Sequence, residues 1–541
     1  MDYKVIDFDK NFIYFTADKE TAYEMSAYYV HPRNCYRFYT SLEAIEELEL
    51  YDIDCEKLQD LKIELTEERR QRFLARGDGL LSGPVDWDDK PDKRMRAYQH
   101  YDYNFLKKLN FAGVFNEQRT GKTPTTLVTV RDDDKIVVVC PAGLKLNWKK
   151  EAKVWTNRDA IVITGTPAVR KKLYQAWKDA KKAILIVSYE TLRADIEWLE
   201  SSMKFGRKKF TIVADEVHRL RNYKTKQSKA LYKLRKYAEK VYALTGTPAV
   251  NHPADVYGIL RFLQPKKYTS YWQFVEYFFK MYEGYFAKEI GKLKGEKAVE
   301  FEQMLSDLST NRKRKQVMKW IPKITKQTIP LEFDKKQLGH YKKATKELLL
   351  GDDREIPNPL ALLTRLRQIC ADPQLLGLEG ESPKTNFIKE FINDNTESII
   401  IFSSFTSYLI SLNRTLEGSV LLTGQQTQDE KDRNIKAFQS GKARILLANI
   451  KAGGVGFTLD KADTIIFADR SYNPVDNDQA ADRFVPVSRD KDYGAKQIID
   501  LVIDKSVENK INKLLEKKQN IISYVNNYSE NGLVKLVQNE L

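Results

Sequence analysis

Gly121, Lys122 and Thr123 form a Gly-Lys-Thr tripeptide directly before a helical stretch. Backbone amides at a helix start, together with a lysine, can hold phosphate groups, and a hydroxyl can hold Mg²⁺. We expect Thr120, Gly121 and Lys122 to cradle phosphates and Thr123 to bind the metal ion. Asn116 stands where such loops usually have their first glycine. A plain turn is the alternative interpretation of this tripeptide.

Two carboxylates end an apolar run at FTIVADE, Phe210 to Glu216. A carboxylate at the end of a strand can hold the Mg²⁺ of bound ATP, and its neighbour can orient or deprotonate the attacking water. Asp215 is therefore the candidate metal ligand and Glu216 the candidate base. A solvated turn is the usual alternative for such a pair, but the phosphate loop favours the chemical interpretation.

The elements that would position these residues are short β-branched runs, each followed by a helical stretch. They cover 136–140, 183–189, 210–216, 398–405, 419–424, 444–450 and 464–469. Apolar runs that alternate with helices predict parallel sheets covered on both faces. The sequence thus predicts an α/β protein with two parallel-sheet domains, at 89–265 and 325–515.

The segments outside these two domains differ from them in composition and in expected structure. Residues 1–88 are of mixed α+β type, and we expect a small accessory domain there. The stretch 77–92 has the Gly, Pro and Asp of a linker. Residues 266–324 are rich in aromatic residues and lysines and predict a helical insertion, and 516–541 a helical tail.

Size and charge narrow the class of protein. A chain of 541 residues is too long for one core, and 90 Lys and Arg against 75 Asp and Glu give a net charge of +15. The electric field of this net positive charge attracts polyanions such as nucleic acid. An acidic membrane surface would also fit, but no apolar run of membrane-spanning length occurs and the start does not resemble a signal peptide. We therefore expect a cytoplasmic protein with no membrane partner.

The four cysteines are widely spaced, with no CxxC pair. Reduced structural thiols are the expected interpretation. No metal is expected beyond the one that accompanies a nucleotide.

Several longer motifs resemble those of the Swi/Snf-type ATPases of helicase superfamily II, from about Arg96 to Lys517. They are NEQRTGKT (motif I), DEVHRLRN (motif II), LTGTPAVNHPADVYGILRFLQP (motif III), RLRQICADPQLL, IIIFSSFTSYL (motif IV) and KAGGVGFTLDKADTIIFADRSYNP (motif V). The resemblance implies two RecA-like domains with ATP and Mg²⁺ between them, DNA lying across both, and helical protrusions that hold duplex DNA. It also implies that Gln99 reads adenine and that Gly456 lies at the ATP site.

The last motif departs from the family pattern. In QAADRFVPVSRD, Gln479 and Arg483 match the residues that reach ATP from the second domain, and Arg483 is the candidate arginine finger. The family continues with His-Arg-Ile-Gly-Gln, so its second arginine is missing here in register. Arg489 is a candidate substitute. In motif I, Arg119 and Thr120 also differ from the family's glycine and leucine.

The resemblance also supplies candidate DNA contacts, for which a solvated surface position is the alternative. They are Lys145, Thr191, Arg221, Lys451, Gly453 and Gly454. The segment from Met25 to Leu48 faintly resembles the HARP-type module of annealing helicases, which would grip branched or single-stranded DNA. A simple packing domain is the alternative there.

We therefore expect a DNA-dependent ATP hydrolase that moves on DNA, with duplex favoured and single-stranded or branched DNA as alternatives, in repair, recombination or replication. A bacterial or phage origin is expected. A strand-separating or annealing helicase is the second hypothesis. The third is an ATP-gated DNA clamp with little hydrolysis, which the altered motifs I and VI suggest.

Overall fold

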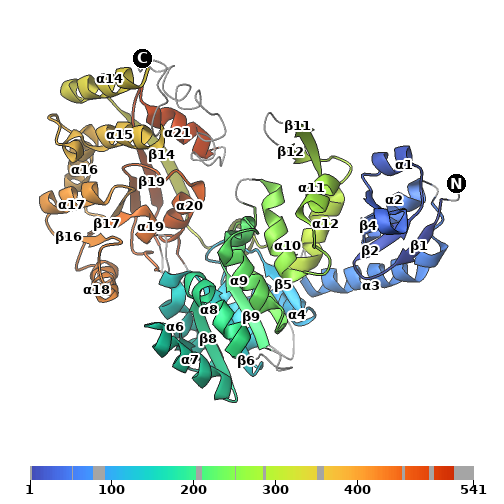
Figure 1. Ribbon diagram of the computed structural model, residues 1–541. Helices are drawn as coiled ribbons and strands as arrows, with labels where there is room; N and C mark the ends of the chain where they lie inside the picture. The colour runs from blue at the N-terminus through green and yellow to red at the C-terminus, as the bar shows by residue number, and fades with distance from the viewer. Residues whose placement is uncertain are drawn as a thin grey trace. The chain divides into compact units, whose positions relative to one another are not determined.

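The computed structural model describes residues 3–51, 53–76, 92–202, 210–249, 252–283, 288–349, 359–453, 457–486 and 493–516. The chain divides into two compact units, Met1–Lys319 and Trp320–Leu541. Figure 1 shows the elements of both. The predicted tail and nearly all of the predicted linker lie outside the described residues.

A seven-stranded parallel sheet forms the centre of the first unit, in the order β13-β5-β10-β9-β6-β8-β7. Its strands are β5 (Phe111–Val114), β6 (Lys135–Cys140), β7 (Ala160–Val162), β8 (Ala183–Ser188), β9 (Phe210–Asp215), β10 (Ala238–Leu244) and β13 (Ser309–Thr310). The three apolar runs predicted for this sheet are β6, β8 and β9.

Helices cover both faces of this sheet. They are α4 (Ala97–Lys107), α5 (Lys122–Val130), α6 (Lys145–Thr156), α7 (Pro167–Asp179), α8 (Tyr189–Ser202), α9 (Lys226–Arg235) and α10 (Tyr257–Leu263). Side chains alternate along a strand, so Val137 and Val139 of β6 pack with α7 to α10, whereas Ile136 and Val138 pack with α4 to α6. This two-sided burial explains why the strands are apolar throughout.

The N-terminal part folds as an antiparallel sheet in the order β1-β2-β4-β3 with three helices. The elements are β1 (Val5–Phe8), β2 (Phe12–Phe15), α1 (Lys19–Glu24), β3 (Tyr28–Val30), β4 (Cys35–Tyr39), α2 (Leu42–Leu50) and α3 (Gln59–Arg76). This small α+β part agrees with the expectation. Its core is not separate, since Phe38 and Tyr39 pack on Tyr277 and Phe278 of the insertion.

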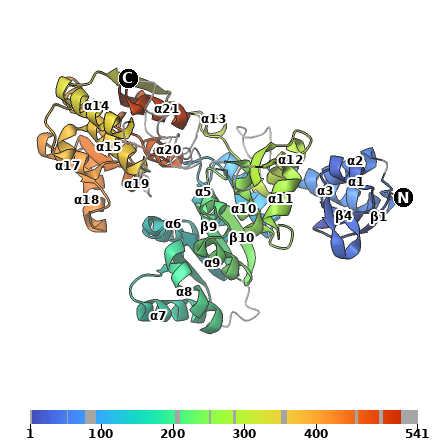
Figure 2. The same cartoon turned by 45° about the horizontal axis from the view of Figure 1, so that its top comes forward.

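The insertion contains more than helices. Its elements are α11 (Tyr271–Phe278), β11 (Phe279–Glu283), β12 (Lys288–Leu293), α12 (Ala298–Leu308) and α13 (Arg314–Val317), besides β13 of the large sheet. The expected helices are present, and the insertion also contains strands β11 and β12, which pair as an antiparallel hairpin that the prediction did not include. Figures 1 and 2 both show α11 and α12 beside the blue N-terminal part.

The second unit contains a six-stranded parallel sheet in the order β14-β19-β18-β15-β17-β16. Its strands are β14 (Ile324–Leu331), β15 (Ile399–Ser403), β16 (Ser419–Leu422), β17 (Ile445–Asn449), β18 (Thr464–Phe467) and β19 (Lys496–Ile503). The four predicted runs are β15 to β18. Two parallel-sheet domains are therefore confirmed.

The helices of the second unit again lie on both faces of the sheet. They are α14 (Lys335–Leu349), α15 (Pro359–Ala371), α16 (Pro383–Asp394), α17 (Thr406–Thr415), α18 (Gln428–Gln439), α19 (Ile450–Gly453), α20 (Pro474–Asp482) and α21 (Val507–Glu516). Ile399 and Ile401 pack with α16 and α17, and Ile400 and Phe402 pack on the face that holds Phe438 of α18. Within the described ranges, no helix combines the length and apolarity needed to span a membrane.

Candidate nucleotide site

The candidate site lies at one edge of the seven-stranded sheet. Strands β5, β10, β9, β6 and β8 are parallel neighbours, so their carboxyl ends open at the same edge. Loops at this edge of an open α/β sheet are where ligands bind. The phosphate loop follows β5, the carboxylate pair lies at the end of β9, and Thr245 follows β10.

The phosphate loop turns into α5 at Gly121. This residue has a φ of +81°, in the left-handed region, and serves as the N-cap of α5. A Cβ atom here would lie 2.5 Å from Nε2 of Gln99, so any other residue would have to displace that side chain and adopt a strained backbone. Amides of the first turn of α5 are left to face a ligand, as an anion site requires.

The Lys122 ammonium group lies within this loop. Its Nζ donates to the carbonyl oxygens of Asn116 at 2.9 Å and Glu117 at 3.2 Å. Thr120 is fully buried, and its hydroxyl donates to the Glu117 carbonyl at 2.7 Å. Lys122 thus occupies the position expected for a phosphate-binding lysine, whereas Thr120 supports the shape of the loop.

Asn116, which replaces the usual first glycine, has a structural part in the loop. Its Nδ2 donates to Asp102 Oδ2 at 2.7 Å, and its Oδ1 accepts from the backbone N–H of Arg312 at 2.9 Å. The buried Arg312 side chain donates to Asp102 Oδ1 at 2.8 Å. The loop is therefore tied both to α4 and to the chain that follows β13.

Gln99 lies beneath the same loop. Its Nε2 donates to the Gly121 carbonyl and to Thr125 Oγ1, and its Oε1 accepts from the Arg96 amide. Only 4% of the residue is exposed. The structure thus shows Gln99 supporting the phosphate loop, and its contact with adenine stays a prediction.

Asp215 ends β9 in buried surroundings. Its Oδ2 accepts from the Trp148 indole at 2.9 Å, and its Oδ1 accepts from the Glu216 amide at 2.9 Å. Burial and the neighbouring charge of Glu216 raise the pKa of Asp215 to about 6, although the Trp148 hydrogen bond and the Lys122 charge act to lower it. The opposing effect of Lys122 means that the phosphate loop and the carboxylate pair are electrostatically linked.

Glu216 lies beside His218, which also contacts Thr245. Its φ of +52° is unusual for a residue with a side chain. His218 Nδ1 lies 3.1 Å from Glu216 Oε2 and 3.2 Å from Thr245 Oγ1. Thr245 is fully buried, so motif II and motif III meet at this histidine.

The donor set fits Mg²⁺. This ion prefers hard oxygen ligands, which Thr123, at the second position of α5, and Asp215 carry. A divalent cation would also offset the mutual repulsion of the buried Asp215 and Glu216 charges.

The candidate DNA residues of the first unit follow the same strand ends. Lys145 Nζ donates to the Ile163 carbonyl at 3.0 Å, and the Thr191 hydroxyl accepts from Ser188 at 3.0 Å. Arg221 ends the short helix Val217–Arg221 and is exposed. Only Arg221 presents an exposed side chain among these three.

The candidates of the second unit lie after its own strands. Lys451 is exposed in α19, which ends at Gly453, and Gln479 lies in α20. Arg483 is the C-cap of α20, and its carbonyl accepts from the Leu459 amide. The roles of these residues at ATP stay predictions.

Three further candidates, Gly454, Gly456 and Arg489, lie outside the described residues.

Sequence reasoning missed three residues of the site. Trp148 lies one turn after Lys145 on α6, so its helical spacing was a usable signal. Thr245 lies inside the recognised motif III and could have been found there. Asp102 carried no signal, because its partner Arg312 is 210 residues away.

A family model described as SNF2-related domain matches residues 13–375, and one described as helicase conserved C-terminal domain matches 383–485. An uncharacterized ATP-dependent helicase of Mycoplasma genitalium is 26% identical over 462 residues, 80% of this chain and 42% of that protein. The mouse chromodomain-helicase-DNA-binding protein 1-like is 26% identical over 444 residues, 75% of this chain and 47% of that protein.

Among solved structures, the Sulfolobus solfataricus SWI2/SNF2 ATPase core in complex with double-stranded DNA is 24% identical. The match covers 85% of this chain and 99% of the solved chain, with a TM-score of 0.38. The chain spans less than half the length of the two curated relatives named above.

Proposed function

The chain belongs to the SNF2-related family, and from this premise we propose that it is an ATP hydrolase that moves along duplex DNA. The observation that carries the proposal is the meeting of Lys122, Asp215 and Glu216 at one edge of the seven-stranded sheet. The net charge of +15 supports a polyanionic partner. One curated relative also bears DNA binding in its name.

In the proposed reaction, the first-turn amides of α5 and the Lys122 ammonium hold the terminal phosphates of ATP. Thr123 and Asp215 would hold Mg²⁺, which when bound neutralises phosphate charge. Water attacks the γ-phosphorus atom, the bond to the β,γ-bridging oxygen breaks, and ADP carries away that electron pair. Glu216 accepts the water's proton, and His218 holds Glu216 in place.

Two residues of the second unit are also proposed to act on ATP. We assign Arg483 to the charge that develops on the γ-phosphate and Gln479 to the positioning of ATP. Hydrolysis would then be coupled to movement of the DNA, whose phosphates Arg221 and Lys451 would contact. Lys145, Thr191 and Gly453 would supply further contacts.

A clamp that binds ATP with little hydrolysis is the second candidate, because motif VI lacks its second arginine in register. The geometry around Glu216 favours hydrolysis. A strand-separating or annealing enzyme uses the same ATP site and differs only in what happens to the DNA.

Displacement of a labelled third strand from a triplex tests the proposed movement. The wild-type chain should release the third strand with ATP, whereas Glu216→Gln should not. Release of a strand from a plain duplex would instead favour a strand-separating enzyme. Nucleotide binding with neither release nor hydrolysis would favour the clamp.

A further inference from the structure

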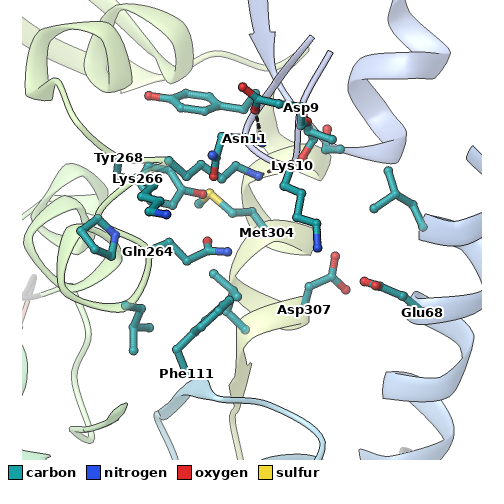
Figure 3. Close-up of a pocket in the computed structure, with 18 of the residues that line it drawn as sticks. Asp9, Lys10, Asn11, Glu68, Phe111, Gln264, Lys266, Tyr268, Met304 and Asp307 are labelled. Carbon is teal, nitrogen blue, oxygen red and sulfur yellow. Dashed lines mark hydrogen bonds between the residues drawn. The ribbon is translucent and has the colours of Figure 1, made fainter. Parts of the chain in front are cut away.

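A cavity of about 1290 Å³ lies away from the nucleotide site, within the first unit. Its walls come from the N-terminal sheet, α3, α12 and the chain after α10. Figure 3 shows the Lys10 side chain directed toward Asp307 and Glu68 on one side of this hollow, with Gln264 and Lys266 on the other. The volume exceeds the roughly 300–1,000 Å³ usual for one small ligand, so it suits a longer one.

The carboxylates of the wall are mostly neutralised from within. Arg69 lies 2.9 Å from Glu43 and 3.4 Å from Asp307, and Arg72 lies 2.6 Å from Glu68. Glu300 lies 3.5 Å from the buried Lys297 and accepts from Tyr277. Arg69 thus serves two of these acids, and two further carboxylates of the wall, Asp9 and Glu64, have no ion pair within the described residues.

The cavity wall also contains four lysines. Lys10, Lys236 and Lys266 are exposed, and none of them pairs with a carboxylate in the part of the chain that the structure describes. A fourth, Lys267, donates from Nζ to the Thr40 carbonyl at 2.9 Å, which leaves two of its N–H groups for a ligand. With eight basic and six acidic side chains in the wall, the net charge of the cavity lining is positive.

The rest of the wall is apolar and aromatic. Phe111, Leu65 and Met304 contribute half-buried side chains. The hydroxyls of Tyr39 and Tyr268 are buried, and neither has a hydrogen-bond partner within the described structure. A buried hydroxyl group that lacks an acceptor costs free energy. A ligand oxygen that accepted a hydrogen bond from either hydroxyl would therefore stabilise the bound complex.

We propose that this cavity binds a short unpaired stretch of nucleic-acid strand, separate from the DNA that the motor moves along. Phosphates would lie against Lys10, Lys236 and Lys266, and a base would lie against Phe111, with Tyr268 donating to an oxygen. Planar bases on aromatic side chains and cations along the backbone are how proteins bind single strands.

The test measures binding of a fluorescent twelve-residue oligothymidylate to the full chain without ATP, over a range of salt. The Lys10→Gln, Lys236→Gln, Lys266→Gln triple variant should bind about tenfold more weakly at moderate salt. Its log–log salt slope should fall by about 2, because each phosphate contact on a single strand contributes about 0.7. The control variant replaces three other exposed lysines of the same unit, Lys149, Lys172 and Lys229, by glutamine.

An equal loss of oligothymidylate affinity in the triple variant and in the control variant would overturn the proposal, because binding would then depend only on the net charge of the protein. Displacement of the oligothymidylate by an equal concentration of thymidine monophosphate would also overturn it, in favour of a free nucleotide. Crosslinking from 5-iodouracil in the oligomer should map to the peptides of Phe111 or Tyr268, and mapping elsewhere would contradict it. Duplex-stimulated hydrolysis should be unchanged in the triple variant, so a failure of the motor proposal leaves this test intact.

Discussion

Nε2 of Gln99 donates to the carbonyl oxygen of Gly121 at 3.2 Å, and so joins α4 to the turn that begins α5. The carboxamide fills the space into which a side chain at position 121 would project. The shape of the phosphate loop therefore depends on a glycine and a glutamine 22 residues apart.

Gly121→Ala should weaken ATP binding by at least tenfold. The left-handed backbone costs an L-residue about 1–2 kcal/mol, and the added methyl group would also displace Gln99. Gly441→Ala is the matched control, because its φ is +79° but no atom lies within 4 Å of the added Cβ. Calorimetric titration with ATP should separate the two, and equal affinities would refute the role of the Gln99 contact.

Asp102→Asn should destabilise the first unit by roughly 3–5 kcal/mol, because it removes the buried carboxylate charge that faces the buried Arg312 guanidinium. Urea unfolding measures this loss. Asp159→Asn is the control, since its pair with Lys153 is exposed and such pairs contribute about 0–1 kcal/mol. Similar unfolding midpoints for the two variants would show that the Asp102 contact does not hold the loop.

Thr245→Val should lower the hydrolysis rate roughly ten- to hundredfold and leave ATP affinity unchanged. The hydroxyl orients His218, and small misplacements of reacting groups have effects of this size. Thr129→Val is the control, since its buried hydroxyl only donates within α5. Comparison of turnover with ATP binding tests this, and an unchanged turnover would exclude the His218 link.

Lys267→Met should stabilise the protein near pH 7 by up to about 3 kcal/mol, an effect that shrinks as pH rises. Desolvation lowers the pKa of Lys267 from 10.5 to about 8 in the folded state. The unfolded chain therefore binds the proton more tightly, and wild-type stability falls as pH drops from about 10.5 to 8. Below pH 8 this loss of wild-type stability no longer changes with pH.

Thermal unfolding of the wild type and Lys267→Met at several pH values measures this difference. The gap between the two melting temperatures should close between pH 8 and 10. The exposed neighbour Lys266→Met provides the control. A gap independent of pH would mean that packing of the methionine, and not loss of the charge, is responsible.

The strands that could be predicted from sequence are those buried on both faces, such as Ile136–Cys140 and Ile399–Ser403. Their β-branched runs reflect contact with helices on either side. Strand β11 was missed, since its sequence FKMYE is largely exposed and pairs only with β12. The shared core of Phe38 and Tyr277 could not be predicted either, because no local pattern links residues so far apart.

The residues of the candidate site also fall into those that the sequence could predict and those that it could not. Lys122, Asp215 and Glu216 were predictable because each belongs to a contiguous motif whose chemistry requires those residue types. The hydrogen bond from Trp148 to Asp215 was not predictable, because 67 residues separate the two in the chain, although the spacing of Trp148 from Lys145 on α6 was a usable signal. Contacts that position the reacting groups come from the fold, whereas the reacting groups themselves belong to local motifs.

The most direct test is the steady-state rate of ATP hydrolysis with and without duplex DNA, for the wild type and for Glu216→Gln. We predict that duplex DNA raises the wild-type rate at least tenfold, more than single-stranded DNA or RNA does. Glu216→Gln should bind ATP and show no turnover under any condition, because the proton acceptor is lost. Full activity of Glu216→Gln, or a wild-type rate that ignores DNA, would contradict the account.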